Sequence, residues 1–285
     1  MESISNLEEL SAVSQNSVYI NADTVQLINS SITFTGKNNI LVIEDDAIIK
    51  NSKIKFMGSN AVCYLSKNRH VYYLDLTIHN RTAVFIDKNC YFNGTFNVTA
   101  SEMQNVIIGL EGLFSFGISL RTADPHLIYD VHTKRRLNSS RSILLGDHIW
   151  IGQSAFVLKG SKIGSGSIIG AAAVVAGKTI PSNVSAVGNP ARVVKEGVFF
   201  TKDCVHSWEK EQTAKYEVSD TDEWIYERDA YTVDLSKIDE EIKSKETAAD
   251  KLEVIKKRLV QSKHKNRFFI EAPRQKKKSI FSKNS

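Results

Sequence analysis

The sequence predicts a mainly β chain folded as a solenoid of short parallel strands, and three observations support this prediction. Aliphatic residues recur with a period of six between residues 145 and 175. Short β-branched runs parted by Asn, Asp, Ser and Gly fill the N-terminal half, and none contains proline or a helical period. Glycine follows four of the six periodic residues, at Gly146, Gly152, Gly164 and Gly170.

The period of six fits neither an α-helix, which repeats every 3.6 residues, nor the alternation of two in a simple strand. It fits a coil in which each hexad forms one short strand and a turn, so that three hexads close a triangular coil of about 18 residues. The aliphatic side chains then point inward and stack on those of the next coil, whereas a sandwich of short strands would not hold a fixed period. These aliphatic residues are Leu145, Ile151, Val157, Ile163, Ile169 and Val175.

The N-terminal half carries a weaker form of the same pattern. Its short runs indicate more irregular coils, so we expect a leader at 1–17 and one β-helix domain over 18–196. The runs expected to form strands are 18–20, 25–27, 32–34, 40–43, 48–49, 54–57, 61–65, 71–76, 83–86 and 106–108.

Three later segments break the rhythm. Residues 119–142 are polar, hold two histidines and a proline, and lie between regular coils, so we expect a loop extruded from the solenoid. Residues 197–233 are rich in aromatic side chains and predict a cap on the end of the solenoid. Residues 234–261 have helical hydrophobic spacing, so 234–285 is expected to be a helix followed by a basic tail.

Composition limits the function. The 285 residues are 42% hydrophobic and 24% charged, as in a folded protein, and no apolar run approaches the roughly 18 residues that span a bilayer. No apolar signal segment is visible near the N-terminus, so a cytoplasmic location is expected. The net charge of +5 divides into +10 over residues 256–285 and −5 over the rest. This division argues against nucleic-acid binding and suggests that the tail contacts the inner membrane surface or a capsule-assembly complex.

The segment HIWIGQSAFVLKGSKIGSGSIIGAAAVVAGKTIPSNVSAVGNPARVVK, residues 148–195, makes the chain recognisable. It resembles the left-handed β-helix (hexapeptide-repeat) acyltransferases, which are homotrimers that use acetyl-CoA. DPHLIYD, followed further along by the Trp of DHIWIG, is similar to bacterial capsular polysaccharide and sialic acid O-acetyltransferases. The resemblance extends more loosely over about 18–196.

The resemblance implies a catalytic histidine, and His126 matches its position in the extruded loop. A sugar hydroxyl is a poor nucleophile until a base accepts its proton, and neutral imidazole suits that task near neutral pH. Asp124 could orient the ring or simply shape the turn. Trp150 matches a tryptophan near the active site of the sialate-capsule enzymes, although packing between subunits is an equal alternative.

The resemblance also implies sites for acetyl-CoA and acceptor, without any metal. The phosphates call for basic residues near the C-terminal coils, and the pantetheine arm for small side chains along a coil edge. Each of these could instead be an ordinary corner or loop residue. The candidates for CoA are Gln153, Gly170, Ala171, Ala172, Lys178, Arg192 and Lys195, and those for acceptor are His132, Arg135, Arg136 and His148.

The sequence therefore predicts an acetyl-CoA-dependent O-acetyltransferase that acts on a bacterial surface polysaccharide containing sialic acid. Three alternatives stay open. One is N-acetylation of an amino-sugar nucleotide, and a second is a non-catalytic solenoid scaffold that binds through its tail. The third is a zinc carbonic anhydrase on the same fold, which the absence of histidine from the regular coils after residue 149 disfavours.

Overall fold

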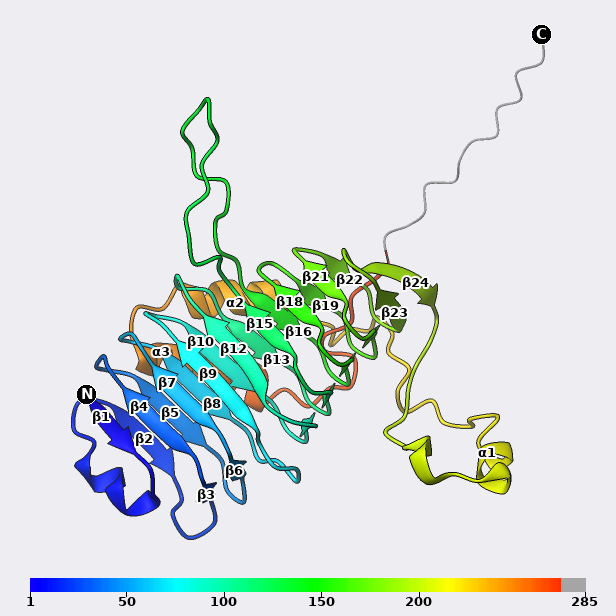
Figure 1. Cartoon of the computed structure of the whole chain (residues 1–285), viewed down its shortest axis with the longest axis horizontal. Helices are drawn as coiled ribbons and strands as arrows, with labels where there is room; N and C mark the ends of the chain where they lie inside the picture. The colour runs from blue at the N-terminus through cyan, green and yellow to red at the C-terminus, as the bar shows by residue number, and fades with distance from the viewer. Residues whose placement is uncertain (273–285) are drawn as a thin grey trace.

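The computed structural model describes residues 1–272 and contains a three-sided solenoid of β-strands (Figure 1). Successive strands along the chain go to different sheets, and neighbours within a sheet pair in parallel along most of its length. The three sheets are called face 1, face 2 and face 3 below. Each corner between two faces is where the chain turns from one sheet into the next.

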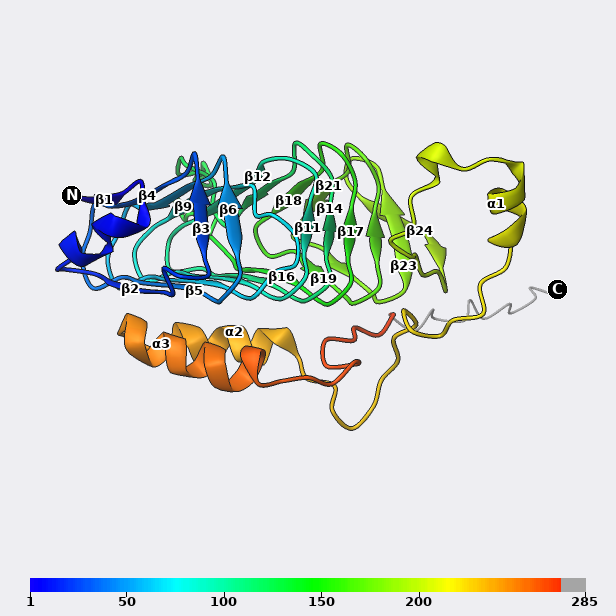
Figure 2. The same ribbon diagram turned by 90° about the horizontal axis from the view of Figure 1, so that it is seen from below.

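The strands have the following bounds. Face 1 consists of β1 (Glu2–Ile4), β4 (Ser31–Phe34), β7 (Lys53–Phe56), β9 (Leu74–Ile78), β12 (Phe96–Ala100), β15 (Ser119–Arg121), β18 (Phe156–Leu158) and β21 (Val174–Ala176). Face 2 consists of β2 (Ser17–Ile20), β5 (Ile40–Ile43), β8 (Val62–Leu65), β10 (Ala83–Ile86), β13 (Val106–Ile108), β16 (Ile143–Leu145), β19 (Lys162–Ile163) and β22 (Thr179–Ile180). Face 3 consists of β11 (Tyr91–Phe92), β14 (Leu113–Phe114), β17 (Trp150–Ile151), β20 (Ile168–Ile169), β23 (Val184–Val187) and β24 (Arg192–Glu196), and Figure 2 shows the pair β3 (Gln26–Ile28) and β6 (Ile48–Lys50) in the same row.

The periodic aliphatic residues do point inward, which confirms the predicted solenoid. Leu145 pairs with Ile163, Ile151 with Ile169 and Val157 with Val175. Each pair joins positions one full coil apart, and all six side chains are fully buried. The interior is therefore one continuous apolar core that runs the length of the coils.

Coil length explains why the period is clear only near the C-terminus. In face 2, Leu41 pairs with Cys63 and Cys63 with Val84, so the N-terminal coils are longer than three hexads and unequal to each other. Further along, Leu144 pairs with Lys162, which is the spacing of three complete hexads. Lys162 then pairs with Thr179, so the coil that follows is shorter and the period ends after Val175.

The N-terminal residues close one end of the solenoid. Strand β1 pairs antiparallel with β4, and a short 3-10 helix, η1 (Leu7–Ala12), follows it. Ile4 is fully buried in the solenoid core, and the carboxylate of Glu2 accepts hydrogen bonds from Ser14, Gln15 and Asn16. The residues expected to be a leader thus cover the open end of the first coil.

The segment at 197–233 only partly forms the expected cap. Phe200, Trp224 and Tyr226 pack against the last coils, but the residues between them project from the body (Figure 1). This projecting arm contains η2 (Val205–Ser207) and the short helix α1 (Lys210–Lys215), and both are exposed. The rings of Trp208 and Tyr216 pack against each other within the arm at an angle of 34°, with their centroids 4.6 Å apart.

The C-terminal segment covers face 2. Helices α2 (Leu235–Lys243) and α3 (Ala248–Ile255) and the π-helix η3 (Lys256–Val260) lie along this face (Figure 2). Ile238, Ile242 and Ile255 pack there against outward side chains such as Phe85 and Ile107. The predicted helical segment is confirmed as two α-helices with apolar sides turned toward the solenoid.

Much of the expected basic tail is folded. Arg267 is only 1% exposed, and all of its guanidinium N–H groups are directed at acceptors. They bind both carboxylate oxygens of Asp147 at 2.8 Å, one oxygen of Asp87 at 2.5 Å, and the carbonyls of Leu259 and Ser262. The remaining basic residues of the predicted tail, Arg274, Lys276, Lys277, Lys278 and Lys283, lie outside the described residues.

We predict that Arg267→Ala lowers the free energy of unfolding by about 3–5 kcal/mol, because it leaves two carboxylates buried without their partner. Urea unfolding followed by circular dichroism measures the change. The matched control is Arg228→Ala, whose exposed ion pair with Glu271 is expected to contribute less than about 1 kcal/mol. Equal losses in the two variants would contradict the assignment of Arg267 as a structural anchor.

Candidate active site

The extruded loop leaves the solenoid after β15 and returns at β16, at the corner between face 1 and face 2 (Figure 1). Its two limbs lie side by side as a narrow hairpin, in which Tyr129 and Arg136 form an isolated antiparallel bridge. The amide of Leu137 donates to the carbonyl of Ile128 at 2.8 Å. The loop inserts between Ile108 and Leu145, which still pair directly, so it does not disturb the stacking of the coils.

Asp124 anchors the base of this loop. Its carboxylate pairs with Lys159 and accepts a hydrogen bond from the amide of Asn138 at 3.0 Å. The same amide donates to the carbonyl of His126 at 2.7 Å. The hydrogen bond from Lys159, and then that from Asn138, lowers the pKa of Asp124. Asp124 therefore acts on His126 through the backbone, and its described hydrogen bonds do not include the imidazole.

His126 is exposed on the loop just beyond this anchor. The side chains that follow it are apolar and also exposed, Leu127 by 57% and Ile128 by 52%, and Leu137 on the return limb is 63% exposed. Apolar side chains at this density on a projecting loop favour contact with another protein surface.

The basic residues of the loop divide into two groups. Arg135 and His132 are exposed, with the carboxylate of Asp130 hydrogen-bonded to the backbone amide of His132. Arg136 instead pairs with Glu102, which lies on the adjacent coil, and this contact raises the pKa of Arg136. Arg136, which is predicted to contact the acceptor, thus has its charge already paired with Glu102.

Trp150 lies on face 3, on the opposite side of the solenoid from the corner that bears the loop. It is 39% exposed and stands in register between Leu113 and Ile168, with the ring of Phe200 5.7 Å away. In a three-sided solenoid, the whole apolar core lies between a corner and the face opposite to it. One chain therefore does not bring Trp150 and His126 together.

The residues predicted to contact CoA lie around the last coils. Gln153, Ala171 and Ala172 are exposed at the corner between face 3 and face 1, where the amide of Ala172 donates to the carbonyl of Gln153 at 2.8 Å. Gly170 lies beside them, and a side chain there would come within 2.7 Å of Val187. Lys178 is exposed at the corner between face 1 and face 2, whereas Arg192 and Lys195 are exposed on β24.

The expectation that His148 contacts the acceptor is wrong for this structure. His148 is fully buried, and its ring is sandwiched between Phe200 and Trp224 at centroid distances of 4.0 and 3.8 Å. Its Nε2 lies 2.9 Å from the carbonyl of Phe200 and so carries the proton, while Nδ1 has no hydrogen-bond partner among residues 1–272. Burial lowers the pKa of His148 to about 4.

Sequence reasoning missed Lys159. Its ammonium group pairs with Asp124 and donates to the carbonyl of Asn138 at 3.0 Å, so it joins the loop to the coil beneath. The signal that could have found Lys159 is its position in the coil. Lys159 and Gly160 occupy the corner directly beneath the point where the loop leaves the solenoid.

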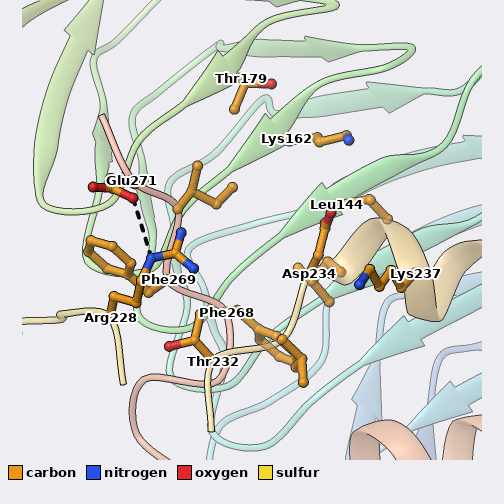
Figure 3. Close-up of a pocket in the computed structure, with 13 residues that line it drawn as sticks. Leu144, Lys162, Thr179, Arg228, Thr232, Asp234, Lys237, Phe268, Phe269 and Glu271 are labelled. Carbon is orange, nitrogen blue, oxygen red and sulfur yellow. Dashed lines mark ion pairs between the residues drawn. The ribbon is translucent and has the colours of Figure 1, made fainter. Parts of the chain in front are cut away.

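A cavity of about 440 Å³ lies on face 2, between the coils, α2 and residues 268–271 (Figure 3). Lys162 donates to Ser236 there, and Arg228 pairs with Glu271 at 3.3 Å. None of the predicted site residues lines this cavity, and its charged groups serve mainly to attach the C-terminal segment. Within residues 1–272, we find no cluster of three or more metal-ligating side chains and no helix suited to crossing a membrane.

Comparison with solved structures supports the predicted left-handed β-helix of the hexapeptide-repeat acetyltransferases. The polySia-specific acetyltransferase NeuO matches with a TM-score of 0.60 and 27% identity, covering 71% of this chain and 93% of that one. The polysialic acid O-acetyltransferase OatWY matches with a TM-score of 0.59 and 23% identity, covering 71% and 95%, and at this identity shows the fold alone. No family model matches the sequence.

Among curated proteins, the chain is similar to two polysialic acid O-acetyltransferases. The one from Escherichia coli O1:K1 / APEC is 34% identical over 128 residues, which is 45% of this chain and 41% of that protein. The one from Neisseria meningitidis is 35% identical over 114 residues, 40% and 53% of the two chains. The matched region thus spans about half the length of these relatives. The predicted resemblance to capsular sialic acid O-acetyltransferases is confirmed.

We predict that the buried stack around His148 weakens in acid. Because its pKa is about 4 in the folded chain and about 6.5 when unfolded, the unfolded state binds the proton first as the pH falls. The stabilisation is complete above pH 6.5 and is lost between pH 6.5 and 4, by up to about 3 kcal/mol. The variant His148→Phe keeps an aromatic ring in the stack but has no group that can take up this proton. Urea unfolding at several pH values should show wild type losing stability relative to His148→Phe in that window, and parallel curves would contradict the assignment.

Proposed function

We propose that this protein is an O-acetyltransferase that moves an acetyl group from acetyl-CoA to a hydroxyl of a sialic acid-containing capsular polysaccharide. The observation that carries the proposal is the similarity, at 34–35% identity, to two polysialic acid O-acetyltransferases, together with a loop that presents His126 from a matching solenoid. A cytoplasmic location, where acetyl-CoA is made, is part of the proposal.

His126 is the proposed general base. Its imidazole accepts the proton of the attacking sugar hydroxyl and later returns it to the departing CoA thiol. Asn138 holds the backbone of His126, and Asp124 with Lys159 holds Asn138, so the ring is presented from an anchored base. This arrangement supports a fixed position for His126 on a loop that is otherwise exposed.

The surface near the last coils suits acetyl-CoA, which would supply the activated thioester. Exposed small residues at Ala171 and Ala172 let an extended pantetheine arm approach the backbone. Exposed cations at Arg192 and Lys195, and at Lys178 on the other side of face 1, are available to phosphate groups. These residues lie at three separate points on the surface of one chain. They can therefore contact the same CoA molecule only where the residues of one chain lie beside those of a second chain.

The complete site is proposed to form between chains of a homotrimer. His126 lies at one corner and Trp150 on the opposite face, so a site that uses both must take them from different copies. The exposed apolar residues beside His126 supply the contact that docks the loop on its neighbour.

We predict that His126→Ala lowers the rate of acetyl transfer at least about 100-fold, because the hydroxyl then loses its base. Release of CoA thiol in the presence of polysialic acid measures the rate. His206→Ala is the control, since His206 lies exposed on the projecting arm. Transfer at the wild-type rate by folded His126→Ala protein would refute the catalytic assignment.

We also predict complementation between two inactive variants. His126→Ala and Trp150→Ala homo-oligomers each lose most of their activity, but co-expression restores it at about a quarter of the sites, where a Trp150→Ala chain supplies His126 and a His126→Ala chain supplies Trp150. Sedimentation velocity reports the number of chains. Activity that stays absent in the mixed oligomer would place the whole site within one chain.

A further inference from the structure

A second hollow lies on the solenoid below Trp150, toward the N-terminus. Its volume is about 520 Å³, and the residues that line it include Arg69, His70, Tyr73, Tyr91, Asn93 and Gly94. It occupies the start of face 3 and the corner between face 3 and face 1. This is the corner that carries Gln153, Ala171 and Ala172 further along.

The hollow presents an aromatic surface. Tyr91 is 39% exposed, and the ring of His70 meets its ring edge-on with a centroid distance of 5.3 Å. Burial, followed by the charges of Lys202 and Arg69, lowers the pKa of His70, so its imidazole is neutral at pH 7. A tyrosine face next to a neutral hydrogen-bonding ring suits the apolar side and the hydroxyls of a sugar.

The hollow also carries excess positive charge. Glu111 is shared by two cations, Lys202 at 2.5 Å and Arg69 at 3.2 Å, so the three groups together bear one net positive charge. Glu111 is largely covered, whereas the Arg69 side chain is 61% exposed. Arg69 can thus turn its remaining N–H groups to an external carboxylate, with which arginine forms paired hydrogen bonds.

Strand register places this hollow on the same surface as Trp150. Tyr91 pairs with Leu113, and Leu113 pairs with Trp150, so the three side chains project from one face. Two strand spacings separate Tyr91 from Trp150, which is about 10 Å. A single pyranose ring does not span that distance, so a saccharide that contacts both must contain more than one sugar.

We propose that the hollow at Arg69, His70 and Tyr91 binds a second, carboxylate-bearing sugar of the acceptor polymer while another sugar is held near Trp150. The inference rests on the proposed function and deepens it, because it assigns the polymer acceptor a second binding site, about 10 Å from Trp150. The polymer would run along face 3, parallel to the axis of the solenoid.

The test uses the full-length protein with three probes: polysialic acid, free N-acetylneuraminic acid and the neutral polymer dextran. Tyr91→Ala and Arg69→Ala are each expected to raise the KM for polysialic acid roughly three- to tenfold, as loss of one stacking or ionic contact would. The KM for acetyl-CoA should stay constant, and the KM for the monomer should rise less than that for the polymer. Tyr91→Phe should restore the wild-type KM, and Tyr19→Ala, which removes an exposed tyrosine from face 2, is the matched control.

The outcomes separate the inference from the proposed function. Unchanged polymer KM in both variants, or equal changes for polymer and monomer, would overturn the second sugar site while transfer by wild type upholds the function. A titration of polysialic acid without acetyl-CoA tests the site alone. Binding that requires Arg69, without transfer by wild type, would support the site and defeat the function. Equal binding of dextran and polysialic acid would overturn the assignment of an acidic sugar.

Discussion

Each coil of this solenoid must place its inward side chains in the same narrow interior as those of the coils on either side. That constraint sets the shape of the molecule. Leu145, Ile151 and Val157 stack on Ile163, Ile169 and Val175, and all six side chains are fully buried, so a large or charged side chain at one of these positions would disturb the coils on either side. Variation is confined to the corners and the outer surfaces, where side chains do not affect the stacking. The candidate functional groups therefore lie on a loop that leaves a corner and on side chains exposed on the faces.

The three faces of the solenoid differ in which parts of the chain pack on them, and this difference suits them to different functions. Face 2 is occupied by α2 and α3 of the same chain, which pack on Phe85, Ile107 and their neighbours. Face 3 keeps aromatic residues exposed, among them Tyr91 and Trp150. The corner between face 1 and face 2 carries the loop with His126. A second chain can thus approach face 3 without displacing the helices, which supports a site completed between copies.

The solenoid and the loop could be predicted from the sequence because both depend on local spacing. A strict hexad specifies the coil length, and an interruption of it specifies where the chain leaves the coil. The partners of long-range contacts could not be predicted in this way. Nothing near His148 indicates that Phe200 and Trp224, which lie beyond the end of the regular coils, enclose its ring. Likewise, Arg267 belongs to a basic stretch by composition. Only the fold reveals that it is buried and paired with two carboxylates that are distant in the sequence.

The ion pairs of Arg267 also have a consequence for biosynthesis. Translation delivers Asp87 and Asp147 well before Arg267, which lies 180 and 120 residues further along the chain. The coils can stack as they emerge, because their contacts join neighbouring turns. The two carboxylates, however, must remain hydrated until their partner arrives, so the region around them can become buried only then. Completion of the nascent protein is thus coupled to a residue near the end of the described chain, and a copy truncated before it would leave Asp87 and Asp147 without the partner that they have in the complete fold.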